Sequence, residues 1–168
     1  MNSNKPQKTR VRIGFGIDVH RLQEGSALRI GGVSIPFHKS LKGHSDADVL
    51  LHAICDALLG AANLGDIGTH FPDTSEAYKG INSLILLEKT AQLIHNKGFT
   101  IGNIDCTLAL QEPKIAPYIP QMKTAIATTL QLPCDDVSIK ATTTEHLGYE
   151  GRGEGVTAYA TVILSGEG

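Results

Sequence analysis

Residues 11–20 read VRIGFGIDVH and are the clearest strand pattern in the chain. Apolar side chains alternate there with glycines and polar residues without a break, which is the period of a half-buried β-strand. We expect the apolar face, Val19 included, to point into the core and so to fix the register of the strand. Asp18 and His20, two residues apart, would then leave the opposite face together, with the two glycines making room beside them.

The remaining patterns alternate between strands and helices. The expected elements are a hairpin over 28–35 that turns at Gly31-Gly32, a helix from Ser45 to about Asn63, a helix over 82–97 closed by Gly98, a strand over 99–110, a helix from near Pro120 to before Pro133, and strands over 137–141 and 156–164. We therefore predict an α+β fold, a single domain over 11–168 with a mixed sheet covered by helices on one face. Residues 1–10 are polar and basic, without the apolar segment of a signal peptide, and are predicted to be a flexible tail.

Composition and charge exclude several classes of protein. Hydrophobic residues make up 41% of the 168, too many for a disordered chain, and no apolar run approaches the ~20 residues of a membrane span. The 15 Lys+Arg are scattered among 17 Asp+Glu, so the net charge is -2 and no basic patch for nucleic acid is present. Cys55, Cys106 and Cys134 have no metal or redox spacing, so we expect free thiols in the reducing cytoplasm of a bacterium.

The first predicted helix carries a further candidate ligand, His52. Ser45 is the expected N-cap, and Asp48 completes a capping box three residues later. Asp48, His52 and Asp56 are spaced by four residues and are expected to form a polar stripe along the helix. A histidine flanked in this way can donate one ring nitrogen to a carboxylate and bind a metal through the other.

Asp18, His20 and His52 together are the ligand types that suit Zn²⁺, with a fourth position left open for catalysis. The alternative interpretation is an ordinary Asp and His on a solvated strand face, because the sequence does not show that His52 meets the other two. A closed site with four protein ligands would instead indicate a structural metal, and no obvious fourth ligand is present.

Three loops have the composition of anion or hydroxyl sites. His44-Ser45 precedes a helix, where free N–H groups favour phosphate. Gly65-Asp66-Ile67-Gly68 allows close backbone approach, with Asp66 and Asp73 available to accept from hydroxyls, although such a loop also simply ends a helix. Thr142 to Glu145 offers three hydroxyls and a carboxylate for phosphate and a divalent ion, or else is the end of a strand. These loops and the ligand set predict a metal-dependent enzyme that acts on a small phosphorylated or polyhydroxy substrate.

Five separated blocks of the sequence resemble the 2-C-methyl-D-erythritol 2,4-cyclodiphosphate synthase family. They are Gly14–His20, Gly43–Asp48 with His52, Ala62–Gly68 with Phe71–Thr74, Lys140–Glu145 and Gly151–Gly155. The resemblance implies a phosphorus–oxygen lyase of non-mevalonate isoprenoid precursor synthesis. In that reaction the 2-phosphate of 4-diphosphocytidyl-2-C-methyl-D-erythritol 2-phosphate attacks the β-phosphate within the same molecule, giving 2-C-methyl-D-erythritol 2,4-cyclodiphosphate and CMP.

The resemblance also implies a homotrimer with active sites between subunits, one Zn²⁺ per site, and Mg²⁺ or Mn²⁺ with the substrate diphosphate. It assigns zinc to Asp18, His20 and His52 and the second metal to Glu145, and it makes His44 and Thr143 catalytic groups that hold and polarise the phosphates. The resemblance also places five of these residues in the substrate site: Asp18, His20, His44, Thr143 and Glu145. The further substrate-binding positions are Ser45, Asp66, Ile67, Gly68, Phe71, Pro72, Asp73, Leu110, Pro113, Lys114, Ile115, Ala116, Ala141, Thr142, Thr144, Tyr149 and Arg152, with 110–116 and 141–143 forming a cytidine pocket on the adjacent subunit.

Tyr149 and Glu150 depart from the family pattern, which usually has phenylalanine and an uncharged residue at these positions. In the family, this stretch and the position of Arg152 line a hydrophobic cavity on the trimer axis that holds an isoprenoid diphosphate, and the charge of Glu150 opposes that property. Two other functions remain open at this stage. One is a zinc-dependent phosphohydrolase or lyase with the same ligands, and the other is a trimeric binding module with a structural metal.

Overall fold

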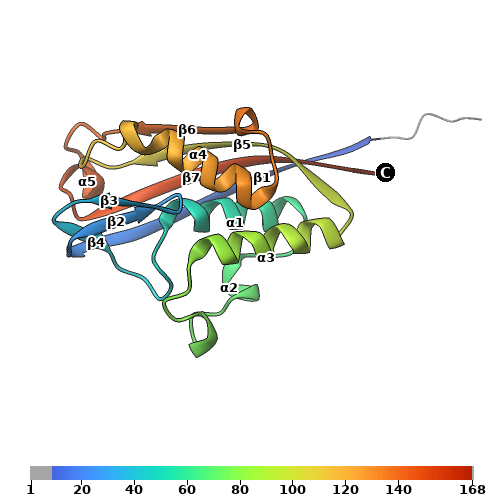
Figure 1. Cartoon of the computed structure of the whole chain (residues 1–168), viewed down its shortest axis with the longest axis horizontal. Coiled ribbons are helices and arrows are strands. Elements are labelled where there is room, and N and C mark those ends of the chain that lie inside the picture. The colour runs from blue at the N-terminus through green and yellow to red at the C-terminus, as the bar shows by residue number, and fades with distance from the viewer. Residues whose placement is uncertain (1–8, 168) are drawn as a thin grey trace, which may run out of the picture.

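A computed structural model describes residues 9–167, and Figure 1 shows a mixed sheet packed against helices. The five-stranded sheet has the order β4-β1-β7-β5-β6, in which only the β5–β6 pair is parallel. Its strands are β1 (Thr9–Glu24), β4 (Lys39–Leu41), β5 (Phe99–Ala109), β6 (Val137–Thr142) and β7 (Gly155–Glu167). A separate hairpin joins β2 (Ala27–Ile30) to β3 (Val33–Pro36). The predicted α+β class with a mixed sheet is confirmed.

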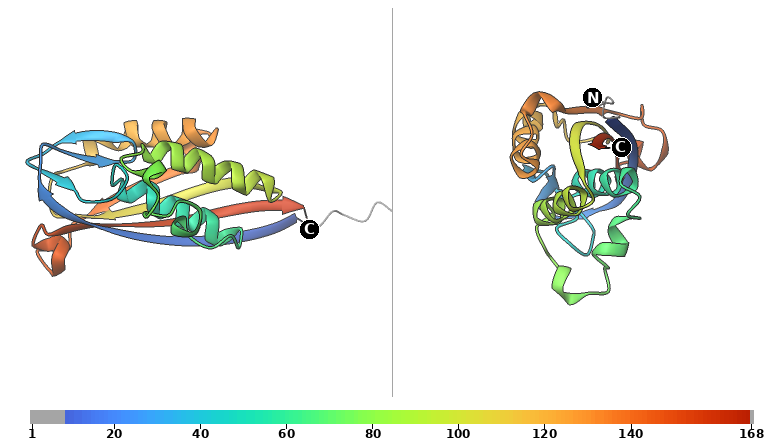
Figure 2. Two further views of the ribbon diagram at one scale, coloured as in Figure 1. Left: turned by 90° about the horizontal axis from the view of Figure 1, so that it is seen from below. Right: turned by 90° about the vertical axis from the view of Figure 1, so that its right-hand side faces the viewer.

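Helices cover one face of this sheet and leave the other face bare, as the two views of Figure 2 show. The covering helices are α1 (Val49–Ala61), α3 (Ser83–Asn96) and α4 (Ile119–Leu130). Short elements connect or flank them: α2 (Ile67–His70), α5 (Gly148–Gly151) and the 3₁₀ turns Glu76–Tyr78, Ala116–Tyr118 and Cys134–Asp136. Among the described residues, no helix is long and apolar enough to cross a membrane. The core therefore lies between one helix layer and one face of the sheet.

The face of β1 that enters this core is the opposite of the one we predicted. The glycine face packs against α1, where a Cβ on Gly14 would lie 1.9 Å from the Ala57 carbonyl oxygen and a Cβ on Gly16 2.1 Å from that of Ala53. The apolar residues point to the bare side of the sheet, and Ile13 and Phe15 are 71% and 63% exposed. The expectation that Val19 points into the core is wrong for the same reason, because only glycine lets the helix backbone approach this closely.

The N-terminal residues of β1 bear on the predicted tail. Thr9 and Arg10 already pair with β7 as part of β1, whereas residues 1–8 lie outside the described residues. The other predicted strands and helices match observed elements within a few residues. The hairpin also turns as expected, with Gly31 and Gly32 both at positive φ. The short elements β4, α2 and α5 had no counterpart in the predictions.

The start of α1 differs from the predicted capping box. Asp48, not Ser45, is the N-cap, and its carboxylate accepts from Leu51 N at 3.1 Å. The same carboxylate accepts from Gly31 N at 2.8 Å and Gly32 N at 2.7 Å, which ties the hairpin turn to the helix. Asp48 is fully buried in these contacts, so the expected polar stripe from Asp48 to His52 does not form. The Asp48 carboxylate already accepts from three backbone N–H groups, so it is not available to hydrogen-bond with His52 one helical turn away.

The close approach of α1 to β1 predicts that no side chain is tolerated at Gly16. The Gly16→Ala substitution places a methyl group against helix backbone that cannot move aside, and we expect it to destabilise the protein by about 1–3 kcal/mol. Thermal unfolding should show a Tm lowered by about 2–4 °C for each kcal/mol.

Gly60→Ala is the matched control for this prediction. Gly60 lies in α1 with nothing within 4 Å of a Cβ, so alanine should raise stability by up to ~1 kcal/mol through its better helix propensity. Equal Tm values for Gly16→Ala and the unchanged protein would contradict the packing described above.

Candidate metal centre and two clefts

Asp18, His20 and His52 converge at the end of β1 that lies under α1. His20 Nε2 lies 2.8 Å from Asp18 Oδ2, and His52 Nδ1 lies 3.2 Å from both of these atoms. Asp18 and His20 reach this point because they share the glycine face of β1, and His52 because α1 crosses that face. The structure therefore brings together the three residues that the sequence proposed as one ligand set.

Hydrogen bonds on the far side of each imidazole decide which nitrogen faces the cluster. His20 Nδ1 lies 2.7 Å from the Lys42 carbonyl oxygen, which can only accept, so Nδ1 carries a proton and Nε2 is free. His52 Nε2 lies 2.9 Å from Ser83 Oγ and 3.0 Å from Ser45 Oγ, on the side away from the cluster. Each ring thus has a polar partner behind it, as metal-bound histidines require.

The cluster needs a positive charge at its centre, because a carboxylate oxygen and imidazole nitrogens crowd together there. An added proton on His20 is one source of that charge. Burial lowers the pKa of His20, but the hydrogen bond and charge of Asp18 outweigh burial and raise the pKa overall. Burial likewise raises the pKa of Asp18, yet its contacts with His20 and His52 hold that pKa well below the usual range. The site is built to hold a cation.

The donor set also fits a divalent metal ion. Zn²⁺ binds imidazole nitrogen and carboxylate oxygen at about 2.0–2.2 Å, which places tetrahedral ligand atoms roughly 3.3 Å apart. The observed separations of 2.8 and 3.2 Å are close to that value. The three ligands open onto a cleft of about 370 Å³, which leaves room for a fourth ligand from outside the protein. An open position is the arrangement of catalytic sites rather than structural ones.

This metal cleft also contains several residues of the predicted substrate site. His44, Ser45, Ile67, Gly68, Phe71 and Asp73 line it together with the metal ligands. Asp66 and Pro72 adjoin these residues in sequence, but neither lines the cleft. The Asp66 carboxylate is occupied as the N-cap of α2, where it accepts from Thr69 N at 2.8 Å and from Thr69 Oγ1 at 2.8 Å.

Several residues of this cleft were not predicted from the sequence. Tyr78 and Leu86 line it, and Tyr78 packs edge-on against Phe71 with ring centroids 5.5 Å apart. Ser83 and Asp46 stand behind His52. Nothing in the local pattern marks Ser83, which is an ordinary first residue of a helix, whereas Asp46 lies within the resembling block but had no role assigned.

A second cleft of about 190 Å³ contains eight further positions of the predicted site. Its lining includes Leu110, Pro113, Lys114, Ile115, Ala116, Ala141, Thr142 and Thr143, together with Gln111. Glu145 stands beside it, because its carboxylate accepts from Thr143 Oγ1 at 2.9 Å. The Thr144 hydroxyl instead donates to the Leu147 carbonyl oxygen at 2.5 Å. Glu145 and the following residue have left-handed backbone, an uncommon conformation that turns this loop sharply.

The two clefts share no lining residue and lie on different parts of the sheet. Asp18 and His20 lie on β1 and His52 on the helix packed against it, whereas the second cleft lies at the end of β6, and two strands separate β1 from β6. At about 4.8 Å between neighbouring strands, β1 and β6 are roughly 14 Å apart. Within one chain, therefore, Thr143 and Glu145 lie at the second cleft, whereas His44 lines the same cleft as the metal ligands.

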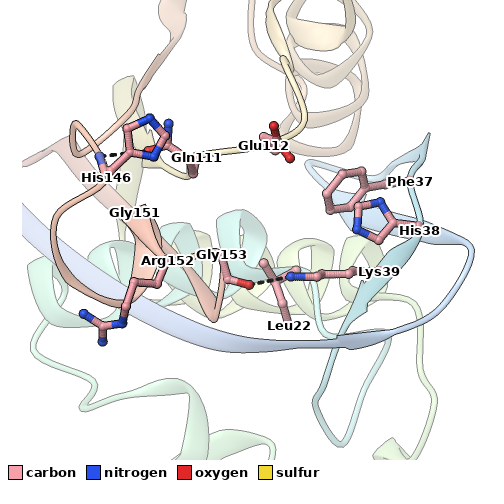
Figure 3. Close-up of a pocket in the computed structure, with 10 residues that line it drawn as sticks. All are labelled: Leu22, Phe37, His38, Lys39, Gln111, Glu112, His146, Gly151, Arg152 and Gly153. Atoms are coloured by element: carbon pink, nitrogen blue, oxygen red, sulfur yellow. Dashed lines mark hydrogen bonds between the residues drawn. The ribbon is translucent and has the colours of Figure 1, made fainter.

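Tyr149 and Arg152 lie in neither cleft. The Tyr149 hydroxyl is 2.6 Å from Thr157 Oγ1, which donates to the buried Glu150 carboxylate at 2.7 Å. Arg152 pairs with the Glu154 carboxylate through Nε at 2.9 Å and through a terminal nitrogen at 3.1 Å. Figure 3 shows a further cavity of about 250 Å³ beside Arg152, and the guanidinium points away from the other labelled side chains.

Comparison with known proteins places these features in a family. The YgbB family model matches residues 11–165. A protein of Syntrophobacter fumaroxidans named 2-C-methyl-D-erythritol 2,4-cyclodiphosphate synthase is 58% identical over 158 residues, covering 94% of this chain and 99% of that protein. One of the same name from Bacteroides fragilis is 56% identical over 156 residues, covering 93% of this chain and 98% of the relative.

Solved structures agree with these sequence relatives. The bifunctional IspDF of Campylobacter jejuni superimposes with a TM-score of 0.91 at 42% identity, covering 95% of this chain and 43% of the longer one. A CDP complex of IspF from Plasmodium falciparum gives a TM-score of 0.82 at 34% identity and covers 94% and 97% of the two chains. With the matched segment spanning β1 through β7, the chain belongs to the YgbB family, among proteins named 2-C-methyl-D-erythritol 2,4-cyclodiphosphate synthase.

Proposed function

We propose that this chain is a 2-C-methyl-D-erythritol 2,4-cyclodiphosphate synthase. It would convert 4-diphosphocytidyl-2-C-methyl-D-erythritol 2-phosphate to the cyclic 2,4-diphosphate and CMP. The observation that carries the proposal is the convergence of Asp18, His20 and His52 on one cation position at the mouth of an open cleft. Its close relatives bear the name of this enzyme, and one neighbouring structure is described as a CDP complex.

The reaction forms one P–O bond and breaks another, with no change of oxidation state. An oxygen of the 2-phosphate attacks the β-phosphorus, and the bridging oxygen leaves with CMP. The nucleophile is already an anion, so no residue has to remove a proton from it. Zn²⁺ on the three ligands, with Mg²⁺ or Mn²⁺ on Glu145, would supply Lewis-acid polarisation and neutralise the phosphate charge.

The residues of the metal cleft would bind and fold the substrate. His44 Nε2 donates to the Ser75 carbonyl oxygen at 3.2 Å, and this contact holds the ring in the wall of the cleft, where it would help to orient the phosphates. Ile67, Gly68 and Phe71 enclose the space in which the erythritol part would lie, and Asp73 offers a hydroxyl acceptor. Holding the two reacting ends together would lower the activation barrier by up to ~7–11 kcal/mol, because the entropic cost of bringing them together is met on binding. Enclosure also keeps out water, which would give linear products.

We further propose that the working unit is a homotrimer in which each active site joins two chains. One chain holds only separated halves, with the metal ligands on β1 and α1 and the proposed cytidine cleft at the end of β6. The bare sheet face offers an apolar surface for association, where Phe15 stacks on Tyr159 at 6.4 Å between ring centroids. Exposed apolar patches of this kind typically mark interfaces. The second cleft of one subunit, with Thr143 and Glu145, would then face the metal cleft of its neighbour.

The cysteines support the proposed cytoplasmic location of this enzyme. Cys55 and Cys106 are buried and Cys134 is exposed, and all three are free thiols. Burial raises the pKa of both Cys55 and Cys106 to about 12, so these two thiols are unreactive packing groups. Free thiols fit a reducing compartment.

The cyclase proposal predicts a specific pair of products. Purified protein with Zn²⁺, Mg²⁺ and the substrate named above should release CMP together with a cyclic diphosphate, detected by ³¹P NMR. His52→Ala should lose bound zinc and at least 10²-fold in rate, roughly the effect of removing an electrostatic stabiliser. His95→Ala is the matched control, because His95 is exposed on α3 and lines neither cleft. Linear phosphate products would indicate a phosphohydrolase, and full turnover by His52→Ala would reject the ligand assignment.

Zinc binding should weaken in acid because a proton on His20 competes with the metal. The pKa of His20 lies above its ordinary value of 6.5, whereas Asp18 stays ionised throughout because its pKa is lowered. As the pH falls below the raised pKa of His20, one proton must leave for each zinc bound, and the affinity should drop about tenfold per pH unit. Chelator competition at a series of pH values measures this slope. A flat profile through and below pH 6.5 would contradict it.

Sites shared between chains predict complementation of two inactive variants. His52→Ala inactivates the half of the site that holds the metal ligands. Lys114→Glu inactivates the half that is proposed to bind cytidine. Random co-assembly of equal amounts should restore about one quarter of the wild-type rate, because a site needs one good half from each kind of chain. CMP release before and after joint refolding measures the recovery.

Two further substitutions control for assembly. Ile13→Glu puts a charge on the bare apolar face and should abolish both the trimer, seen by sedimentation velocity, and the recovered activity. Ile85→Glu, at an exposed apolar position on α3, should leave both intact. Sites contained within one chain would show no recovery in any mixture.

A further inference from the structure

Behind His52 lies a buried polar relay that runs away from the metal cleft. Ser83, the first residue of α3, is fully buried, and its Oγ is 2.9 Å from His52 Nε2. The Ser83 hydroxyl is also hydrogen-bonded to the Asp46 carboxylate. The second oxygen of Asp46 accepts from Ser83 N at 3.1 Å, and Arg29 Nε lies 3.4 Å from the same oxygen, an ionic contact rather than a hydrogen bond. The relay therefore links α1, α3 and the loop before α1.

The direction of each hydrogen bond in this relay follows from the chemistry of its members. An ionised carboxylate only accepts, and Asp46 takes both the O–H and the N–H of Ser83 beside a guanidinium. The single hydroxyl proton of Ser83 is thus committed to Asp46. Ser83 Oγ can then meet His52 only as an acceptor, so His52 Nε2 carries the ring proton. Its Nδ1 is left with a lone pair that points at Asp18 and His20.

The neighbouring hydroxyl of Ser45 does not impose the same choice. Ser45 Oγ also lies 3.0 Å from His52 Nε2, but among the described residues no carboxylate holds its proton. The Ser45 hydroxyl accepts from Ala47 N at 3.3 Å, but its own proton can still rotate toward His52 or away from it, which suits either tautomer of imidazole. The Asp46 carboxylate behind Ser83 therefore decides the direction of the hydrogen bonds in the relay.

We propose that Asp46 and Ser83 are positioning residues of the metal centre, which fix His52 in the Nε2–H tautomer and so present Nδ1 to the metal. This inference rests on the proposed metal-dependent function. Without the relay, His52 populates the tautomer whose N–H points at the cation position, and each binding event must first reverse it. Outer partners of metal-bound histidines are worth about 10–100-fold in metal affinity.

The tautomer itself is the first measurement, and it needs no metal. In metal-free protein labelled with ¹⁵N-histidine, long-range ¹H–¹⁵N spectra distinguish Nδ1–H from Nε2–H, and the His52 signals are identified by their loss in His52→Ala. We expect Nε2–H in the unchanged protein and in Ser45→Ala. Ser83→Ala and Asp46→Asn should shift the population toward Nδ1–H, since the amide of the latter can donate to Ser83 and reverse the relay.

Metal affinity is the second measurement. Chelator competition with Zn²⁺, and the visible spectrum of bound Co²⁺ as a probe of ligand geometry, should show binding about 10–100-fold weaker in Ser83→Ala and Asp46→Asn. Asn82→Ala is the control for the helix terminus. Asn82 caps α3 through Leu84 N at 3.0 Å and is not among the hydrogen-bond partners of His52, so its loss should lower the Tm but change neither tautomer nor affinity.

The outcomes separate this inference from the proposed function. Unchanged protein that binds neither Zn²⁺ nor Co²⁺ would overturn the proposed function and the inference with it. Normal metal binding by the unchanged protein, with wild-type tautomer and affinity in both relay variants, would overturn the inference alone. A metal affinity reduced equally in Asn82→Ala would also overturn it, because the effect would then come from helix stability.

Discussion

The backbone contact between α1 and the glycine face of β1 is the constraint on which the site depends. A side chain at Gly14 or Gly16 would overlap the helix carbonyl groups, so only glycine permits this separation. The same contact sets His52, on α1, above Asp18 and His20, which continue the glycine face of the strand. The metal centre is therefore an extension of helix-on-sheet packing, and a small shift of α1 would open the ligand triangle.

Packing brings the three side chains together, and hydrogen bonding orients them as a candidate metal site. The Lys42 carbonyl orients His20, and the Ser83 hydroxyl stands behind His52, so each ring turns a nitrogen toward Asp18. Crowded acceptor atoms repel one another unless a cation lies among them. The raised pKa of His20 and the lowered pKa of Asp18 both express that need. In the proposed enzyme, a divalent ion takes the place of the proton.

Two features of the single chain support its proposed association with other chains. Its apolar residues on β1 are exposed, and its two clefts lie on strands that are not neighbours in the sheet. Both features have one explanation if neighbouring chains cover the apolar face and bring the cytidine cleft of one subunit to the metal cleft of the next. The low net charge is compatible with the polyphosphate substrate of the proposed enzyme, because metal ions and N–H donors would supply the positive charge locally.

The sequence by itself determined the local structure and the ligand types. Period-two alternation predicted β1 and put Asp18 and His20 on one face, and the spacing of apolar residues predicted the helix that carries His52. Local pattern does not report which side of a strand another element covers, so the buried face of β1 was predicted wrongly. Asp48 was likewise misplaced, because the donors that claim it come from Gly31 and Gly32 in a distant hairpin. Ser83 and Asp46 reach His52 only through the packing of α3 against α1. Contacts between segments far apart in the chain depend on how helices cross the sheet, and only the tertiary structure decided them.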